Sequence, residues 1–166
     1  MGCNYALYTV RQVVERFIKG GNTVNLCALD LIKAFDKVNH HALIIKLVKR
    51  NLPVDLLNIL ENWLKSCFSS VKWLHIFSDI FVIKFGVRQG SVLSPFLFVV
   101  YPDDLPTVRS LIHRSFVVLY ADDILLIAPS ISELQQLLHN CEKELSWLDM
   151  RINKKKILLL AYRSQI

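Results

Sequence analysis

The chain has 166 residues, 53% of them hydrophobic, and a formal net charge of +6 with a pI near 9.2. This length is enough for one domain with a substantial core, and the basic excess favours polyanionic partners over acidic ones. The longest uncharged run, residues 89–102, is shorter than the roughly 18 residues that a membrane-spanning helix needs, so no membrane partner is expected. Residues 1–4 lack a signal-peptide pattern, which together with four scattered cysteines indicates an intracellular protein.

The first third of the chain predicts a helix, a buried strand and two further helices. Apolar residues recur at helical spacing over residues 5–19 and stop at two glycines. Residues 24–29 form a short apolar run of strand type, and Asp30 stands at its end. Helices are expected over about 42–48 and 54–66, with a break at the proline between them.

The middle of the chain predicts a β-hairpin, a loop and a helix. Residues 70–85 contain two strand-like runs around a turn at residues 78–79. The glycine-containing loop over 86–95 leads into the helix, with Ser94 as candidate N-cap and Pro95 at the first helical position.

Two adjacent carboxylates, Asp122 and Asp123, lie between the apolar runs 116–120 and 124–128. This pattern predicts a buried hairpin with the aspartates at its tip. Burial of unpaired charge is unfavourable, and a hard cation such as Mg²⁺ would offset that cost. A solvent-exposed turn is the alternative, because Asp is common in turns. A second doublet, residues 103–104, has no flanking strands and is interpreted as structural.

The last part of the chain predicts a helix up to about residue 149, a basic connection and a final strand over 157–161. Ser130 and Glu133 form a capping box at the start of the helix. Without the middle insertions the order is β-α-β-β-α-β. This order predicts an α+β fold, a split β-α-β (ferredoxin-like) antiparallel sheet covered by helices on one face.

In that topology the strand 24–29 lies beside the hairpin, so Asp30 can approach Asp122. Facing aspartates of this kind can hold two divalent ions about 3.5–4 Å apart, the arrangement that supports phosphoryl transfer. The backbone carbonyl of Leu31 could complete the metal shell.

Three segments carry a family resemblance: residues 28–40 (ALDLIKAFDKVNH), 86–95 (GVRQGSVLSP) and 120–123 (YADD). In order and spacing they resemble successive motifs of reverse transcriptases of non-LTR (LINE-like) retrotransposons. The resemblance implies one reverse transcriptase domain fragment over 1–166, a polymerase palm with part of the fingers and no thumb. It also implies an RNA-directed DNA polymerase that adds dNTPs to a DNA primer on an RNA template, using two Mg²⁺ ions or Mn²⁺.

The resemblance also assigns roles to single residues. Asp30, Asp122 and Asp123 correspond to the catalytic metal ligands, together with the carbonyl of Leu31, and Asp30 and Asp122 are the direct ones. The remaining positions are expected to contact substrates: Phe35 the sugar 2′ position, Gln89 and Gly90 the incoming nucleotide and template, Arg88 a template phosphate, and Lys156 the triphosphate.

Plainer interpretations exist for several of these residues. Without the resemblance, Phe35 is a core residue, Asp36 a cap or ion-pair partner, and Arg88 and the lysines at 154–156 are solvated charges. The resemblance further implies that fingers, thumb and endonuclease regions belong to a longer polyprotein acting in the nucleus, at the site of integration. The alternative function is a catalytically inactive truncated remnant that at most binds nucleic acid.

Overall fold

The computed structural model describes residues 3–103, 105 and 114–163. The chain forms two compact units, which we call the sheet unit (residues 1–32 and 102–166) and the helical unit (residues 33–101). The predicted single reverse transcriptase domain stays a prediction. Within the described ranges, no helix is both long and apolar enough to cross a membrane.

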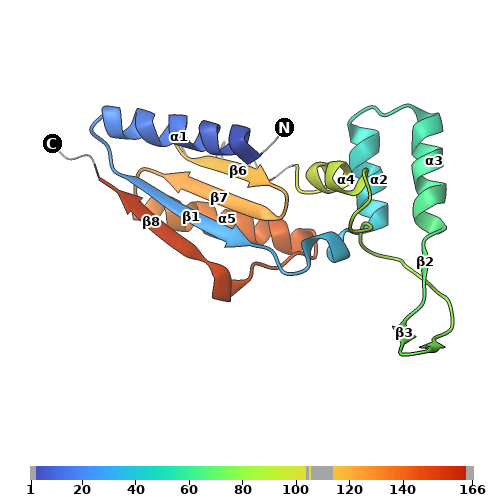
Figure 1. The fold of residues 1–166 in the computed structure, drawn as a ribbon. Helices are drawn as coiled ribbons and strands as arrows, with labels where there is room; N and C mark the ends of the chain where they lie inside the picture. The colour runs from blue at the N-terminus through green and yellow to red at the C-terminus, as the bar shows by residue number, and fades with distance from the viewer. Residues whose placement is uncertain (1–2, 104, 106–113, 164–166) are drawn as a thin grey trace. The chain divides into compact units, whose positions relative to one another are not determined.

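The sheet unit is built on four antiparallel strands in the order β6-β7-β1-β8 (Figure 1). They are β6 (Phe116–Tyr120), β7 (Asp123–Ala128), β1 (Val24–Asp30) and β8 (Leu158–Tyr162). The predicted antiparallel sheet is therefore confirmed, and β1 lies between β7 and β8. In this register Asp30 is opposite Asp123 at one end of the sheet.

Helices α1 (Cys3–Lys19) and α5 (Ile131–Trp147) cover opposite faces of this sheet. Val24 and Leu26 of β1 pack with Ile127 of β7 beneath apolar side chains of α1, among them Phe17. Successive strand residues point to opposite faces, so the buried Cys27 faces the other side, where α5 contacts β1 and β7. In Figure 1, α5 passes behind the sheet. The expected cover by helices on one face is therefore wrong, because α1 occupies the second face.

The start of α5 confirms Ser130 as the N-cap, although the Glu133 carboxylate bonds the Ser130 hydroxyl where a capping box uses the backbone amide. The Ser130 hydroxyl accepts a hydrogen bond from the Glu133 amide at 3.2 Å and donates one to the Glu133 carboxylate at 2.7 Å. The buried side of the helix includes Cys141, and burial raises the pKa of its thiol to about 12. This thiol is therefore a protonated packing group, as predicted for the cysteines.

The helical unit contains the helices α2 (His40–Lys49), α3 (Val54–Lys65) and α4 (Ser94–Val100) and the short 3-10 helix η1 (Ala34–Lys37). Leucines of α2 and α3 and Phe98 of α4 are buried, and α2 contacts both α3 and α4. The Asn39 side chain caps α2 by accepting hydrogen bonds from two amides of its first turn.

The hairpin of the helical unit differs from the prediction. Strand β2 (Phe68–Ser69) pairs with β5 (Phe81–Val82), and β3 (Lys72–Trp73) pairs with β4 (Ile76–Phe77), so the tight turn lies at residues 74–75. The turn expected at 78–79 is wrong, because Ser78 belongs to the ladder: its amide donates to the Val71 carbonyl at 2.9 Å. Leu74 in the actual turn has a φ of 53°, which a branched side chain rarely adopts.

Candidate active site

Three aspartates of the sheet unit, Asp30, Asp122 and Asp123, lie where β1 ends and β7 begins. Asp30 and Asp123 are direct partners in the antiparallel register, so their side chains lie on the same face of the sheet. Asp122 occupies the two-residue turn between β6 and β7 beside Ala121, whose φ of 49° is left-handed. The predicted hairpin tip is thus present, and the register brings Asp123, rather than Asp122, directly opposite Asp30.

Asp30 is held as an anion by two donors. Its Oδ2 accepts a hydrogen bond from Nδ2 of Asn153 at 3.1 Å and lies 3.2 Å from Nζ of Lys156. The Asn153 hydrogen bond and then Lys156 lower the pKa of Asp30 below its ordinary value. Asp30 is therefore ionised at neutral pH.

Asp123 is in the opposite electrostatic situation. Desolvation raises its pKa, and the neighbouring charges of Asp122 and Asp30 add to that effect. The end of the sheet thus concentrates negative charge that a bound cation would relieve.

The backbone pairing of Leu31 determines the direction of its carbonyl. Leu31 forms an antiparallel bridge with Ile152. The hydrogen bonds lie on either side of this pair, from the Ile32 amide to the Arg151 carbonyl and from the Asn153 amide to the Asp30 carbonyl, so Leu31 and Ile152 do not bond each other directly. In such a non-hydrogen-bonded pair the residue's own amide and carbonyl point away from the partner segment, here toward the side of β1 that faces β7.

These oxygens fit a hard divalent cation, because Mg²⁺ is bound through one or two carboxylates and completes its shell with water and substrate phosphates. No group of three or more His, Cys, Asp or Glu side chains in the described ranges is arranged to hold a metal ion by itself.

Phe35 belongs to the helical unit, where its ring stacks on that of Phe98 with centroids 4.6 Å apart and planes at 27°. The loop after the hairpin is joined to η1 by hydrogen bonds from the Gly86 amide to the Val38 carbonyl, at 2.7 Å, and from the Val87 amide to the Phe35 carbonyl, at 2.8 Å. The structure therefore holds two of the motif segments, 28–40 and 86–95, against each other within this unit at residues 35–38 and 86–87.

Arg88, Gln89 and Gly90 follow directly in that loop. The side-chain Nε2 of Gln89 donates a hydrogen bond to the Asp36 carboxylate at 3.4 Å, and the backbone carbonyl of Arg88 accepts one from the Ser94 hydroxyl at 2.5 Å. Ser94 is the first residue of α4 and Leu93 its N-cap, so the predicted Ser94 cap is wrong and the hydroxyl secures the loop instead. Gly90 is exposed, and no atom of the described residues outside its chain neighbours lies within 4 Å of a Cβ built on it.

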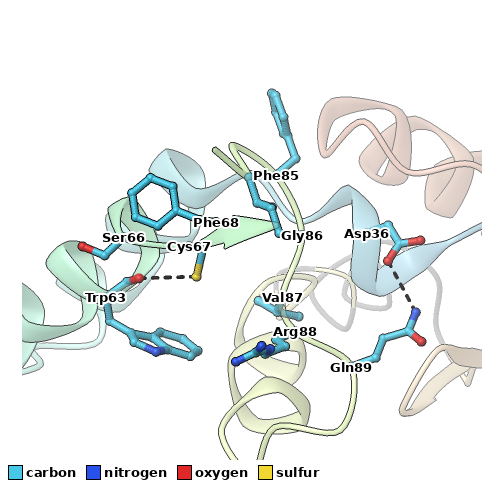
Figure 2. Close-up of a pocket in the computed structure, with 11 residues that line it drawn as sticks. Asp36, Trp63, Ser66, Cys67, Phe68, Phe85, Gly86, Val87, Arg88 and Gln89 are labelled. Atoms are coloured by element: carbon cyan, nitrogen blue, oxygen red, sulfur yellow. Dashed lines mark hydrogen bonds between the residues drawn. The ribbon is translucent and has the colours of Figure 1, made fainter. Parts of the chain in front are cut away.

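An open pocket of about 540 Å³ lies beside this loop within the helical unit (Figure 2). Its lining combines aromatic rings, an arginine and hydrogen-bonding side chains, which are the groups that bind nucleobases and phosphates. They include Trp63, Phe68, Phe85, Asp36, Arg88 and Gln89.

The positive charge of the chain is concentrated in the same unit. Residues 33–101 contain nine lysines and arginines against four aspartates and glutamates, which is +5 of the total +6. Asp30, Asp122 and Asp123 lie in the nearly neutral sheet unit, so the basic excess and these three aspartates belong to different units.

One residue of the site was missed by the sequence reasoning, namely Asn153. It stands in a basic connection of which the sequence reasoning assigned only Lys156 to the site, and its hydrogen bond to Asp30 reveals its own contact. Of the second aspartate doublet, residue 104 lies outside the described residues.

A family model described as "Reverse transcriptase (RNA-dependent DNA polymerase)" matches residues 5–165. The chain therefore belongs to the reverse transcriptase family, and the predicted family is confirmed.

The similar proteins are polymerases of mobile elements. The chain is 32% identical over 119 residues to the "Probable RNA-directed DNA polymerase from transposon X-element" of Drosophila melanogaster, covering 69% of this chain and 13% of that protein. It is 32% identical over 138 residues to the "RNA-directed DNA polymerase from mobile element jockey" of the same organism, covering 77% and 15%. The chain therefore spans only a small part of the length of these relatives.

Among solved structures, the apo telomerase of Candida tropicalis truncated from its C-terminal domain superposes with a TM-score of 0.80 at 14% identity. The match covers 97% of this chain and 35% of that one. At this identity the likeness shows the fold alone, a mixed α/β polymerase fold with an antiparallel sheet.

Proposed function

We propose that this chain is the metal-binding part of an RNA-directed DNA polymerase, which transfers a nucleotide from a dNTP to a primer 3′-OH on an RNA template. The observation that carries the proposal is the pairing of Asp30 with Asp123, with Asp122 in the adjoining turn. In a chain of the reverse transcriptase family, these aspartates correspond to the metal ligands of a polymerase palm.

The finer fold assignment is part of the same proposal. The strand order β6-β7-β1-β8, with β6 and β7 consecutive in the chain, is the order of a split β-α-β sheet, which supports a palm. The helical unit then corresponds to part of the fingers. Because the relatives are far longer, we propose that the rest of the fingers, the thumb and an endonuclease lie elsewhere in a polyprotein that acts in the nucleus.

At the carboxylates, Asp30, Asp122, Asp123 and the Leu31 carbonyl would bind two Mg²⁺ ions, with Mn²⁺ as a substitute. The ions, when bound, neutralise the phosphates and activate the 3′-OH. Lys156 is proposed to contact the triphosphate, because its side chain is 65% exposed and its ammonium group, 3.2 Å from Asp30, already lies at the carboxylates.

In the helical unit, Phe35 is proposed to exclude the 2′-OH of a ribonucleotide. Its stacking on Phe98 supports this role, because a ring fixed on one side cannot turn away to admit an extra hydroxyl. Gln89 and Gly90 are proposed to contact the incoming nucleotide and the template, and Gly90 permits close approach because it has no side chain. Arg88 is proposed to bind a template phosphate.

The test is primer extension on an RNA template in Mg²⁺, with Asp122→Asn as the inactive variant. Asp103→Asn is the matched control, because it makes the same substitution in the other aspartate doublet. Extension by the wild type and by the control, but not by Asp122→Asn, supports the polymerase. Equal extension by all three chains would refute the assigned site.

The second candidate function is a remnant that binds nucleic acid without catalysis. It is favoured by one observation: the helical unit holds +5 of the net charge and none of the metal-site aspartates. RNA affinity that falls steeply with salt, unchanged by Asp122→Asn and accompanied by no extension in any chain, would support this candidate.

A further inference from the structure

Asn153 is joined by hydrogen bonds both to Asp30 and to the two lysines that follow it. Its amide donates to the Asp30 carbonyl at 2.8 Å, and its side-chain Nδ2 donates to Asp30 Oδ2 at 3.1 Å. Its Oδ1 accepts from the Lys155 amide at 3.3 Å, and its carbonyl accepts from the Lys156 amide at 2.9 Å. One residue thus binds the end of β1 and begins the next turn.

These contacts follow from an irregularity in the sheet. The ladder between β1 and β8 ends with Ala28 opposite Leu158, and pairing resumes with Leu31 opposite Ile152. Two residues of β1 therefore face five residues of the other chain segment. The surplus folds into the 3-10 helix η3 (Lys154–Lys156), which acts as an extended bulge.

Both donors to Asp30 converge on the same oxygen, Oδ2. Lys156 is long, flexible and mostly exposed, whereas Asn153 is short and anchored through its own backbone to residue 30. Of the two, only Asn153 is rigid enough to set the direction of the carboxylate.

We propose that Asn153 is a positioning residue: it holds Oδ2 of Asp30 and thereby presents Oδ1 to the divalent cation. The inference deepens the proposed function and rests on it. Groups that orient a metal ligand in this way typically contribute 10- to 100-fold to metal affinity.

The experiment is Mn²⁺ binding to the whole chain, measured by the loss of the free-ion EPR signal. Asn153→Ser keeps a short oxygen that can cap the Lys155 amide but removes the donor to Asp30. Asn25→Ser is the matched control, because the buried Asn25 side chain donates to the Pro129 carbonyl at 3.2 Å, at the other end of β1. It loses a hydrogen bond of the same sheet without touching Asp30.

We expect Asn153→Ser to weaken Mn²⁺ binding about tenfold or more, Asn25→Ser to bind as the wild type does, and Asp30→Asn to lose the site. Wild-type affinity in Asn153→Ser would overturn the positioning role while leaving the metal site intact. Equal binding by the wild type and Asp30→Asn would instead refute the metal site of the proposed function, and the positioning role with it.

A second readout applies even if Asn153→Ser does not fold. In the ¹⁵N-labelled chain, the side-chain amide resonances of Asn153 should shift toward solvent-exposed values in Asp30→Ala. Resonances that stay in place would show that Asn153 does not hold this carboxylate and would overturn the inference.

Discussion

Gly86→Ala tests the close contact between two motif segments of the helical unit. Gly86 has a φ of 87°, and a Cβ added to it would lie 2.9 Å from the Asp36 Cα and 3.1 Å from the carbonyl oxygens of Phe35 and Asp36. All three atoms belong to the backbone, so no side chain can turn aside. Gly90 offers a matched control, because its φ is 82° and its Cβ position has open space, with no contact within 4 Å among the residues that the structure describes.

The two substitutions therefore share one cost and differ in another. A left-handed alanine costs about 1–2 kcal/mol, of which about 0.4–1 is recovered from the less flexible unfolded chain. Gly90→Ala should therefore lower the free energy of unfolding by about 1 kcal/mol. Gly86→Ala adds about 1–3 kcal/mol of overpacking, because carbon atoms pack best at about 3.5–4.0 Å, and should lower it by about 2–4 kcal/mol in total.

The assay is urea unfolding followed by tryptophan fluorescence in a Trp147→Phe background. The remaining tryptophans, Trp63 and Trp73, both lie in the helical unit and report its unfolding. Equal losses for the two alanine variants would refute the close approach between residue 86 and η1.

Three further predictions concern the sheet unit. Because the pKa of Asp30 is lowered in the folded state, Asp30→Asn should reduce the melting temperature at neutral pH. Because the pKa of Asp123 is raised in the folded state, Asp123→Asn should increase the melting temperature at neutral pH. The Asp30 difference should shrink below about pH 4, where the unfolded carboxyl group becomes protonated. The Asp123 difference should already shrink above that pH, as the folded carboxyl group with its raised pKa takes up a proton. Equal signs in a pH series of melting curves would contradict the assignment. Ser130→Ala should cost about 1 kcal/mol in urea unfolding by loss of the α5 cap, while Ser130→Asp should retain most of the stability; equal losses would argue against capping. Lys156→Ala should raise Mn²⁺ affinity a few-fold, because it removes a competing cation 3.2 Å from Asp30. The control Lys155→Ala removes the same charge from η3 and should have a smaller effect. Identical Mn²⁺ titrations of the two variants would exclude this competition.

Local patterns predicted most elements of the fold. The apolar run before Asp30 has strand composition and forms β1. The runs on both sides of the 122–123 doublet have it too and form β6 and β7. The cap at Ser130 could also be predicted, because it depends on residues three positions apart. In both cases the determining interactions lie within a few residues of each other.

The wrong predictions concern features that are determined by contacts between distant parts of the chain. Residues 78–79 have turn composition, yet the turn is made by Leu74 in a conformation that leucine seldom adopts. Helical periodicity identifies the apolar stripe of α1 but not the face of the sheet that the stripe covers. Nothing in the sequence around Asn153 predicts its contact with Asp30, because the two residues are 123 positions apart.

The division of the chain also determines the order in which its parts can fold. The helical unit is continuous in sequence, and the hairpin β6-β7 closes over two residues, so both can form soon after synthesis. The strands that pair with β1 in the described part of the chain, β7 and β8, are both distant in sequence: Asn25 is 103 positions from its neighbour Ala128, and Asp30 is 123 positions from Asn153. Pairing across such separations is slow, although lengthening a loop adds little free-energy cost. On the ribosome, Asp30 therefore leaves the exit tunnel long before any of its partners, and we expect assembly of the carboxylate site to be the last event in folding.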